Sequence, residues 1–148
     1  MILHKFIYYL GQNYRNPSLK KHFKFLKESE NWSLKKLEDY QLKKLKELVS
    51  FSSVNSNYYN EKFKEFNVLP SDILTLKDLK KLPITTKKEL VNHNDAIHTQ
   101  FYFKKKYRAV TSGSSGESLE FFREESADSF NRAAISRGYS WYDIEPWE

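Results

Sequence analysis

Residues 111–117 of this 148-residue chain read Thr-Ser-Gly-Ser-Ser-Gly-Glu, a combination suited to binding phosphate. The two glycines permit positive φ angles, which turn successive backbone amides toward one anion. Four hydroxyls add donors that rotate to meet an oxygen. The segment therefore predicts a loop that grips a polyphosphate, and its candidate binding residues are Thr111, Ser112, Gly113, Ser114, Ser115, Gly116 and Glu117.

Two better-known phosphate motifs are excluded. No Lys-Ser/Thr pair follows Gly116, so the loop is not of the Walker type, and the glycine spacing differs from the dinucleotide fingerprint. An ordinary surface hairpin loop has a similar Ser/Gly composition, and it stays open as the alternative interpretation.

The loop needs elements on both sides to hold it. Residues 107–110 and 119–122 read as short strands that pair as a hairpin across it. A helix is predicted over residues 125–139, and its apolar spacing predicts a buried stripe of Ala127, Phe130, Ala134 and Trp141.

The first two-thirds of the chain reads as helices with clear start and stop signals. Asn16 before Pro17 and Ser33 are predicted helix caps, a further helix is predicted over residues 56–66, and Asn67 is its predicted left-handed stop. Two short helices should begin at boxes in which an acid follows a hydroxyl by three residues, Thr75 with Asp78 and Thr86 with Glu89. Neither short helix is stable alone, so both must pack on something.

Composition narrows the chemistry. The net charge is +6, but the lysines are interleaved with glutamates along helices, which favours solvated helix faces over a nucleic-acid surface. Cysteine is absent, which excludes disulfides, thiolate catalysis and zinc-thiolate sites. His93 and His98 frame a polar segment with too few ligands for an expected metal site. Lys104-Lys105-Lys106 beside aromatic residues could grip single-stranded nucleic acid, so a small basic binding module without catalysis is the alternative function.

The N-terminal segment is amphipathic and is interrupted by His4 and Lys5. It has no clean signal-peptide core, and no run approaches the length of a membrane span. We expect a cytoplasmic protein without stable membrane insertion. A membrane-surface role is conceivable for this helix, but its short apolar face favours packing on neighbouring helices.

The residues around the loop form a longer pattern. Upstream stand Ser56-Asn57-Tyr58-Tyr59, residues 73–79, Leu82-Pro83-Ile84 and residues 86–90; downstream stand residues 119–123 and 137–141. In this order, over about two-thirds of the chain, the sequence resembles adenylate-forming enzymes, the AMP-binding and acyl-CoA synthetase superfamily. Within it, the resemblance is to the phenylacetate–CoA ligase family and its capsular polysaccharide biosynthesis (CapK-like) relatives.

The resemblance implies a fold and an activity. The fold would be mainly α with a short β-hairpin, the N-terminal part of the α/β adenylate-forming fold, truncated before most of its central sheet. Residues 1–95 would form a helical region, and residues 96–148 the start of the nucleotide-binding domain. Residues 111–117 would hold the phosphates of ATP, with Mg²⁺, while an unidentified carboxylic acid attacks the α-phosphate. Coenzyme A or a capsule-pathway molecule would accept the acyl group.

Members of that family are several times longer, and their remaining active-site residues have no counterpart in this chain. We therefore expect no catalytic residue here, no turnover by this chain alone, and self-association through an exposed apolar face. Glu117 stands where many relatives have Lys, and Ser118 replaces a frequent Pro. Asn57 and Asn67 replace a frequent Pro and Gly. The Glu117 difference puts the strength of phosphate binding in doubt.

Overall fold

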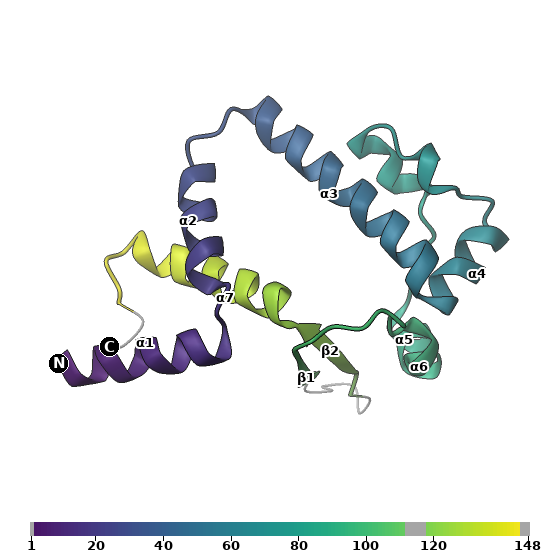
Figure 1. Cartoon of the computed structure of the whole chain (residues 1–148). Helices are drawn as coiled ribbons and strands as arrows, with labels where there is room; N and C mark the ends of the chain where they lie inside the picture. The colour runs from purple at the N-terminus through teal and green to yellow at the C-terminus, as the bar shows by residue number, and fades with distance from the viewer. Residues whose placement is uncertain (1, 112–117, 146–148) are drawn as a thin grey trace. The chain divides into compact units, whose positions relative to one another are not determined.

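The computed structural model describes residues 2–111 and 118–145 and is mainly helical, with one two-stranded antiparallel sheet in that part of the chain (Figure 1). This confirms the mainly helical prediction with a short hairpin, while the link to the adenylate-forming fold stays a prediction. The elements, in order, are α1 (Ile2–Arg15), α2 (Leu19–Ser29), α3 (Leu34–Asn55), α4 (Asn57–Glu65), η1 (Pro70–Asp72), η2 (Leu76–Lys81), α5 (Lys87–Asn92), α6 (Asn94–Ile97), β1 (Lys106–Val110), β2 (Glu120–Glu124) and α7 (Glu125–Ser140).

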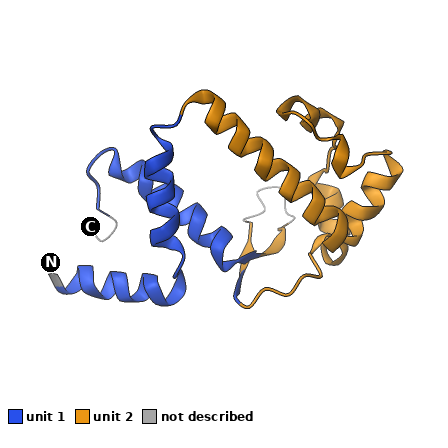
Figure 2. Cartoon of the chain, turned by 45° about the horizontal axis from the view of Figure 1, so that its top comes forward, with its two compact units in different colours: residues 1–32, 105–107, 123–148 blue, residues 33–104, 108–122 orange. Residues whose placement is uncertain are grey.

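The chain forms two compact units that alternate along the sequence (Figure 2). Unit 1 comprises residues 1–32, 105–107 and 123–148, and unit 2 comprises residues 33–104 and 108–122. Both strands of the hairpin therefore contribute residues to both units. The predicted division at residue 95, between a helical region and the start of a nucleotide-binding domain, stays a prediction.

The core of unit 2 forms where α3, α4 and the segment after η1 meet. Val49, Phe63 and Ile73 are buried together there, and the half-buried side chains of Leu42, Leu45, Tyr59 and Leu82 pack against them. Burying a side chain of this size contributes about 1.5–3 kcal/mol. This cluster lets the short helices of unit 2 persist, because none of them would be stable alone.

Side-chain caps set the helix boundaries of unit 2 where the sequence predicts them. Ser33 Oγ accepts a hydrogen bond from the Lys36 amide at the start of α3, and Ser56 Oγ accepts one from the Tyr59 amide at the start of α4. Asn67 adopts a φ of 52° just past α4. The Val68 amide then bonds the Phe63 carbonyl at 2.8 Å, which gives the bonding pattern of a Schellman end. These three predictions are confirmed.

The two predicted hydroxyl–acid boxes also form, with one difference in helix type. Thr86 and Glu89 bond reciprocally at the start of α5: the Thr86 amide donates to Glu89 Oε2 at 2.7 Å, and the Glu89 amide donates to Thr86 Oγ1 at 3.2 Å. Asp78 Oδ2 accepts from the Thr75 amide at 2.7 Å, but the segment that follows, η2, is a 3₁₀ helix. Pro83 soon after it leaves little length for an α-helix.

A buried lysine ties α4 to α5. The side chain of Lys62 is only 7% exposed, and its Nζ donates to Glu89 Oε1 at 2.6 Å, the Ile84 carbonyl at 2.7 Å and Tyr58 Oη at 2.8 Å. All three donors of the ammonium are used, which offsets its loss of hydration. The hydrogen bond from Lys62, followed by those from Thr86, lowers the pKa of Glu89 to about 2.

Unit 1 is built on α2 packed against α7, and part of this contact is aromatic. His22 and Phe25 of α2 approach the Phe130 ring, with centroids 5.3 and 6.4 Å away. Phe25 also meets Trp32 edge to face at 5.4 Å. Beside these rings, the structure departs from what apolar spacing predicts.

Two of the three buried residues of α7 are polar. Asp128 and Ser129 are buried beside Ala133, whereas Ala127 is exposed and Trp141 is 59% exposed. The predicted buried stripe is therefore wrong for Ala127 and Trp141, which are exposed. Its other two members, Phe130 and Ala134, are half-buried. Hydrophobic spacing cannot reveal a helix face that is buried through hydrogen bonds.

Asn16 supplies those hydrogen bonds. It is buried, and its Nδ2 donates to Asp128 Oδ2 at 3.0 Å and to Ser129 Oγ at 3.1 Å. The predicted cap at Asn16 is wrong, since α2 begins at Leu19. The side-chain amide of Asn16 instead donates to Asp128, 112 residues away in sequence. Ser18 also reaches α7, where its amide and hydroxyl donate to the Glu125 carboxylate at 3.1 and 2.8 Å.

The first helix does not pack as predicted. Its large apolar side chains remain exposed, among them Leu3, Phe6, Ile7 and Leu10, each more than half accessible to solvent. The expectation that this apolar face packs on neighbouring helices is therefore wrong. Within residues 2–111 and 118–145, no helix combines the length and the apolar character that crossing a bilayer requires.

Replacing Asp128 with Ala should destabilise the chain by about 2 kcal/mol, because Asn16 then keeps only Ser129 as an acceptor and Arg132 loses its ion-pair partner. Urea unfolding followed by circular dichroism measures this. Asp39→Ala is the matched control, since its pair with Lys35 is exposed and should be worth at most about 0.5 kcal/mol. Equal losses in the two variants would contradict a central role for Asp128.

The low pKa of Glu89 makes a pH-dependent contribution to stability. Its pKa is about 2 in the folded chain against an ordinary 4.5, so the stabilisation is present above pH 4.5 and is lost as the pH falls toward 2. Glu89→Gln should lower the free energy of unfolding at neutral pH and flatten its decline between pH 4.5 and 2. The exposed Glu38→Gln is the control, and a decline as steep in Glu89→Gln as in the parent chain would refute the assignment.

Candidate functional site

The predicted phosphate loop is framed by the hairpin of β1 and β2. Of its seven candidate residues, Ser112, Gly113, Ser114, Ser115, Gly116 and Glu117 lie outside the described residues, and Thr111 lies within them. Thr111 follows β1 directly, and Leu119 precedes β2. The structure thus describes the frame of the loop from both sides.

Two hydrogen bonds close the hairpin at the base of the loop. The Thr111 amide donates to the Leu119 carbonyl, and the Leu119 amide donates to Thr111 Oγ1, both at 2.9 Å. Thr111 therefore has a structural role in addition to its predicted one, because its hydroxyl oxygen pins the opposite strand. The hydroxyl proton is still available to a ligand oxygen, since the bond to Leu119 uses only acceptor capacity.

One step farther from the loop, a bidentate ion pair joins the strands. Arg108 Nε and Nη2 donate to the two carboxylate oxygens of Glu120, each at 2.6 Å. Hydrogen bonding to Arg108 lowers the pKa of Glu120, and the same bonds raise the pKa of Arg108. The two charges cancel, so the Arg108–Glu120 pair brings no net positive charge to a phosphate. Two of the five guanidinium donors are used in the pair.

Helix α6 and the residue after it hold the second strand. Asn94 Nδ2 donates to the Glu120 carbonyl at 2.8 Å, and the His98 ring meets the Phe122 ring edge to face at 5.6 Å. These contacts lie within unit 2, and they fix β2 next to the residue that pairs with Arg108. The base of the loop is thus positioned by backbone, ionic and aromatic contacts together.

The histidines of this region are engaged with aromatic rings. His93 lies 5.6 Å from the Tyr58 ring, and His98 lies at the same distance from Phe122. In the part of the chain that the structure describes, no group of three or more His, Cys, Asp or Glu side chains is arranged to hold a metal ion.

The basic cluster Lys104-Lys105-Lys106 lies at the start of β1, and one of its side chains is already engaged within the chain. Lys105 Nζ donates to the Tyr14 carbonyl at 2.6 Å, and the ammonium lies 5.4 Å from the Tyr14 ring centroid and 5.7 Å from that of Tyr107. Lys105 thus holds unit 1 together. Lys104 is exposed. This engagement weakens the interpretation of residues 104–106 as a nucleic-acid grip.

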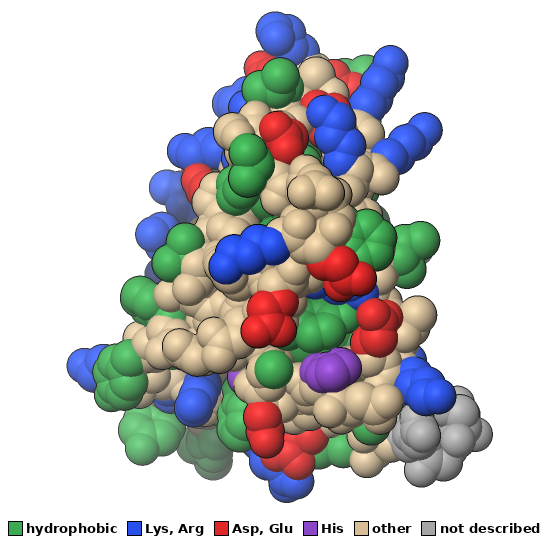
Figure 3. All heavy atoms as spheres, turned by 90° about the vertical axis from the view of Figure 1, so that its right-hand side faces the viewer, with side chains coloured by type: hydrophobic (Ala, Val, Ile, Leu, Met, Phe, Trp, Pro, Cys, Tyr) green, Lys and Arg blue, Asp and Glu red, His purple; other side chains and the backbone are tan. Residues whose placement is uncertain are grey.

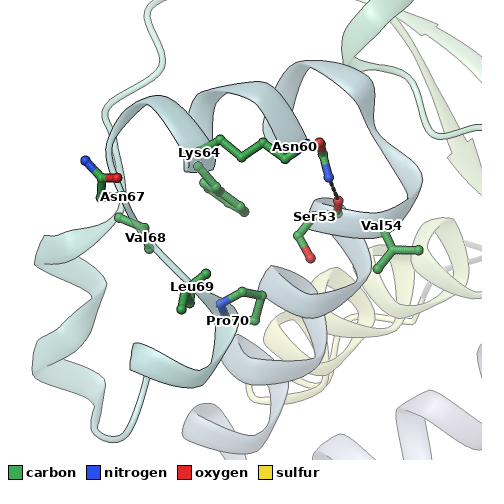
Figure 4. A pocket seen from close by; sticks show the side chains of 9 residues that line it. Ser53, Val54, Asn60, Lys64, Asn67, Val68, Leu69 and Pro70 are labelled. Atoms are coloured by element: carbon green, nitrogen blue, oxygen red, sulfur yellow. Dashed lines mark hydrogen bonds between the residues drawn. The ribbon is translucent and has the colours of Figure 1, made fainter.

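Unit 2 also contains a cavity of about 580 Å³ away from the hairpin (Figure 4). Its walls come from the end of α3, from α4 and from the loop that leads to η1, and they include Val54, Phe63, Val68, Leu69 and Pro70. Asn60 at its edge is engaged, because its Nδ2 donates to the Ser53 carbonyl at 2.6 Å. The lining is largely apolar, and Lys64 is its one charged member, so it lacks the converging polar groups of a reaction site.

Sequence reasoning missed Arg108, Glu120 and Asn94. A signal for the first two exists, since a basic and an acidic residue occupy the two strands of a predicted hairpin. No comparable signal exists for Asn94, because its partner is a backbone carbonyl that only the folded chain brings near.

Replacing Thr111 with Val should open the base of the loop. The Leu119 amide loses its acceptor, and its hydrogen exchange should accelerate roughly fivefold, the equivalent of about 1 kcal/mol. Thr111→Ser keeps the oxygen and is the matched control, with exchange near that of the parent chain. NMR exchange rates decide between them, and equal protection of Leu119 in Thr111→Val and the parent would contradict the assigned bond.

Known proteins do not identify the chain. No protein-family model matches the sequence, and no curated protein matches it.

Proposed function

We propose that this chain supplies the phosphate-binding loop of an ATP-dependent, carboxylate-activating ligase. The observation that supports this proposal is the closed hairpin base, where Thr111 and Leu119 exchange two hydrogen bonds. A Ser/Gly segment held at both ends keeps its amides and hydroxyls concentrated near one place. That arrangement favours an extended anion such as a polyphosphate.

In the proposed reaction, a carboxylate oxygen of an organic acid attacks the α-phosphorus of ATP. A bond forms between this oxygen and phosphorus, the bond between the α-phosphorus and the bridging oxygen breaks, and pyrophosphate leaves with that electron pair. The loop stabilises the negative charge that builds on the leaving pyrophosphate. An acceptor such as coenzyme A then attacks the acyl carbonyl carbon, the bond from that carbon to the phosphate oxygen breaks, and AMP leaves with that electron pair.

The charges near the loop support a role for Mg²⁺ in the proposed reaction. Arg108 is neutralised by Glu120, and Glu117 adds a negative charge in sequence beside the loop. Backbone amides and hydroxyls are the donors that remain, and they carry no full charge. Magnesium carried by the polyphosphate would supply positive charge against the carboxylate of Glu117.

The alternative, a basic binding module without catalysis, depends on different residues. It requires charge at residues 104–106, and Lys105 of this set is already engaged by Tyr14. The two functions thus separate by mutation: the ligase proposal depends on the loop glycines, and the binding module depends on the lysines.

Gly113→Val and Gly116→Val should each abolish the NMR amide shifts that Mg·ATP produces in the chain. We expect the parent to bind Mg·ATP in the millimolar range, about −4 kcal/mol, because it offers phosphate donors without a base pocket. Gly11→Val is the matched control, because a side chain at Gly11 meets no atom within 4 Å. Shifts that persist in both loop variants would refute the proposal, and shifts lost only in Lys104→Gln would favour the binding module.

A further inference from the structure

The net charge of the chain is concentrated at one end. Residues 1–27 contain six Lys or Arg side chains and no Asp or Glu, so they account for the whole formal charge of +6. The remaining 121 residues hold nineteen basic and nineteen acidic side chains. Figure 3, which views the chain from the side of α4–α6, shows basic and acidic side chains interspersed. The N-terminal segment is thus electrostatically distinct from the rest of the chain.

The same segment exposes an apolar helix face. Leu3, Phe6, Ile7 and Leu10 recur at helical spacing along α1 and are 64%, 59%, 57% and 54% exposed. Tyr14 extends this face by one further turn and is also exposed. These are large side chains on one side of one helix, which is unusual for a surface that contacts only water.

The opposite, more polar side of α1 is the side that meets the rest of unit 1. Tyr8 and Gln12 are half-buried, and burial raises the pKa of Tyr8. Arg15 lies over the Tyr107 ring at 4.5 Å, and the Tyr107 hydroxyl donates to the Arg15 carbonyl. The helix is therefore attached mainly through its polar side. On the apolar side Lys105 contacts Tyr14, while Leu3, Phe6, Ile7 and Leu10 stay exposed.

We propose that residues 1–27 bind the surface of an anionic lipid bilayer, with α1 lying in the interface. The apolar face would insert at the boundary between headgroups and acyl chains. The basic residues of the segment would attract anionic headgroups, and two of them, Lys24 and Lys27, also pair with Glu28 and Glu30 just past its end. Tyr14 suits this depth, because its ring is apolar and its hydroxyl stays hydrated. This mode of binding needs no spanning helix, and it is independent of ATP binding at the loop.

The positive charge of residues 1–27 and the exposed apolar face of α1 together favour a bilayer over other partners. A nucleic acid would use the positive charge but would leave the apolar face of α1 in water. A second copy of the chain could cover the apolar face, but it would bring six like charges against six. An anionic bilayer satisfies the charge and the apolar face together.

The test is co-sedimentation of the full chain with lipid vesicles. Vesicles of phosphatidylcholine containing about 30% phosphatidylserine should sediment the chain, and pure phosphatidylcholine vesicles should sediment far less of it. Leu3→Gln with Ile7→Gln should abolish binding. Lys20→Gln, Lys21→Gln and Lys24→Gln together should weaken the partition coefficient roughly a hundredfold, since each basic residue contributes about fivefold near such a surface.

Matched controls lie in unit 2. Leu34→Gln with Leu48→Gln changes two exposed leucines of α3, and Lys46, Lys77 and Lys80 changed to Gln remove the same charge; both should bind like the parent. Equal sedimentation with neutral and anionic vesicles, or equal losses in the control variants, would overturn the proposal. So would concentration-dependent dimerisation without lipid that Leu3→Gln with Ile7→Gln abolishes, because it would assign the face to a second copy.

Discussion

The carboxylates at the junction of β2 and α7 are the constraint on which unit 1 and one strand of the hairpin depend. Glu124 accepts from the Ser126 and Ala127 amides and caps the helix, Glu125 accepts from Ser18, and Asp128 accepts from Asn16. The bonds to Glu125 and Asp128 link residues more than 100 positions apart. Burial raises the pKa values of Glu125 and Asp128, but hydrogen bonds outweigh it, so both pKa values lie below their ordinary range and both groups stay ionised.

Each end of β2 is held within its own unit: its last residues by this junction in unit 1, and its first residue by α6 in unit 2. Strand β2 runs directly into α7, so fixing the start of the helix also fixes the end of the strand. Asn94 holds the other end of β2, beside the Arg108–Glu120 pair and the Thr111–Leu119 closure. Local hydrogen bonds thus determine where the Ser/Gly segment begins and ends. The proposed chemistry requires this, because a polyphosphate site needs its donors gathered at one place.

Local signals in the sequence predicted local structure well. Ser33, Ser56, Asn67 and the Thr86–Glu89 box act within a few residues of their own positions, and the structure confirms each of them. The strands were predicted for the same reason, since alternation and turn residues are local. Features that depend on distant partners could not be predicted. Asn16 resembles a helix cap but is buried against α7, and Lys62 resembles a solvated lysine but is buried against Glu89. The loop itself was identified by composition and resemblance, and its function stays a proposal.

Phosphate binding by the proposed loop can be measured separately from recognition of the adenine base. Mg·tripolyphosphate and adenosine should be titrated separately into the labelled chain, with the amides of Thr111 and Leu119 followed by NMR. We expect saturable shifts with millimolar tripolyphosphate and none with adenosine, because the proposed site binds ATP through its phosphates alone. Shifts with adenosine alone, or no response to tripolyphosphate at any soluble concentration, would contradict it.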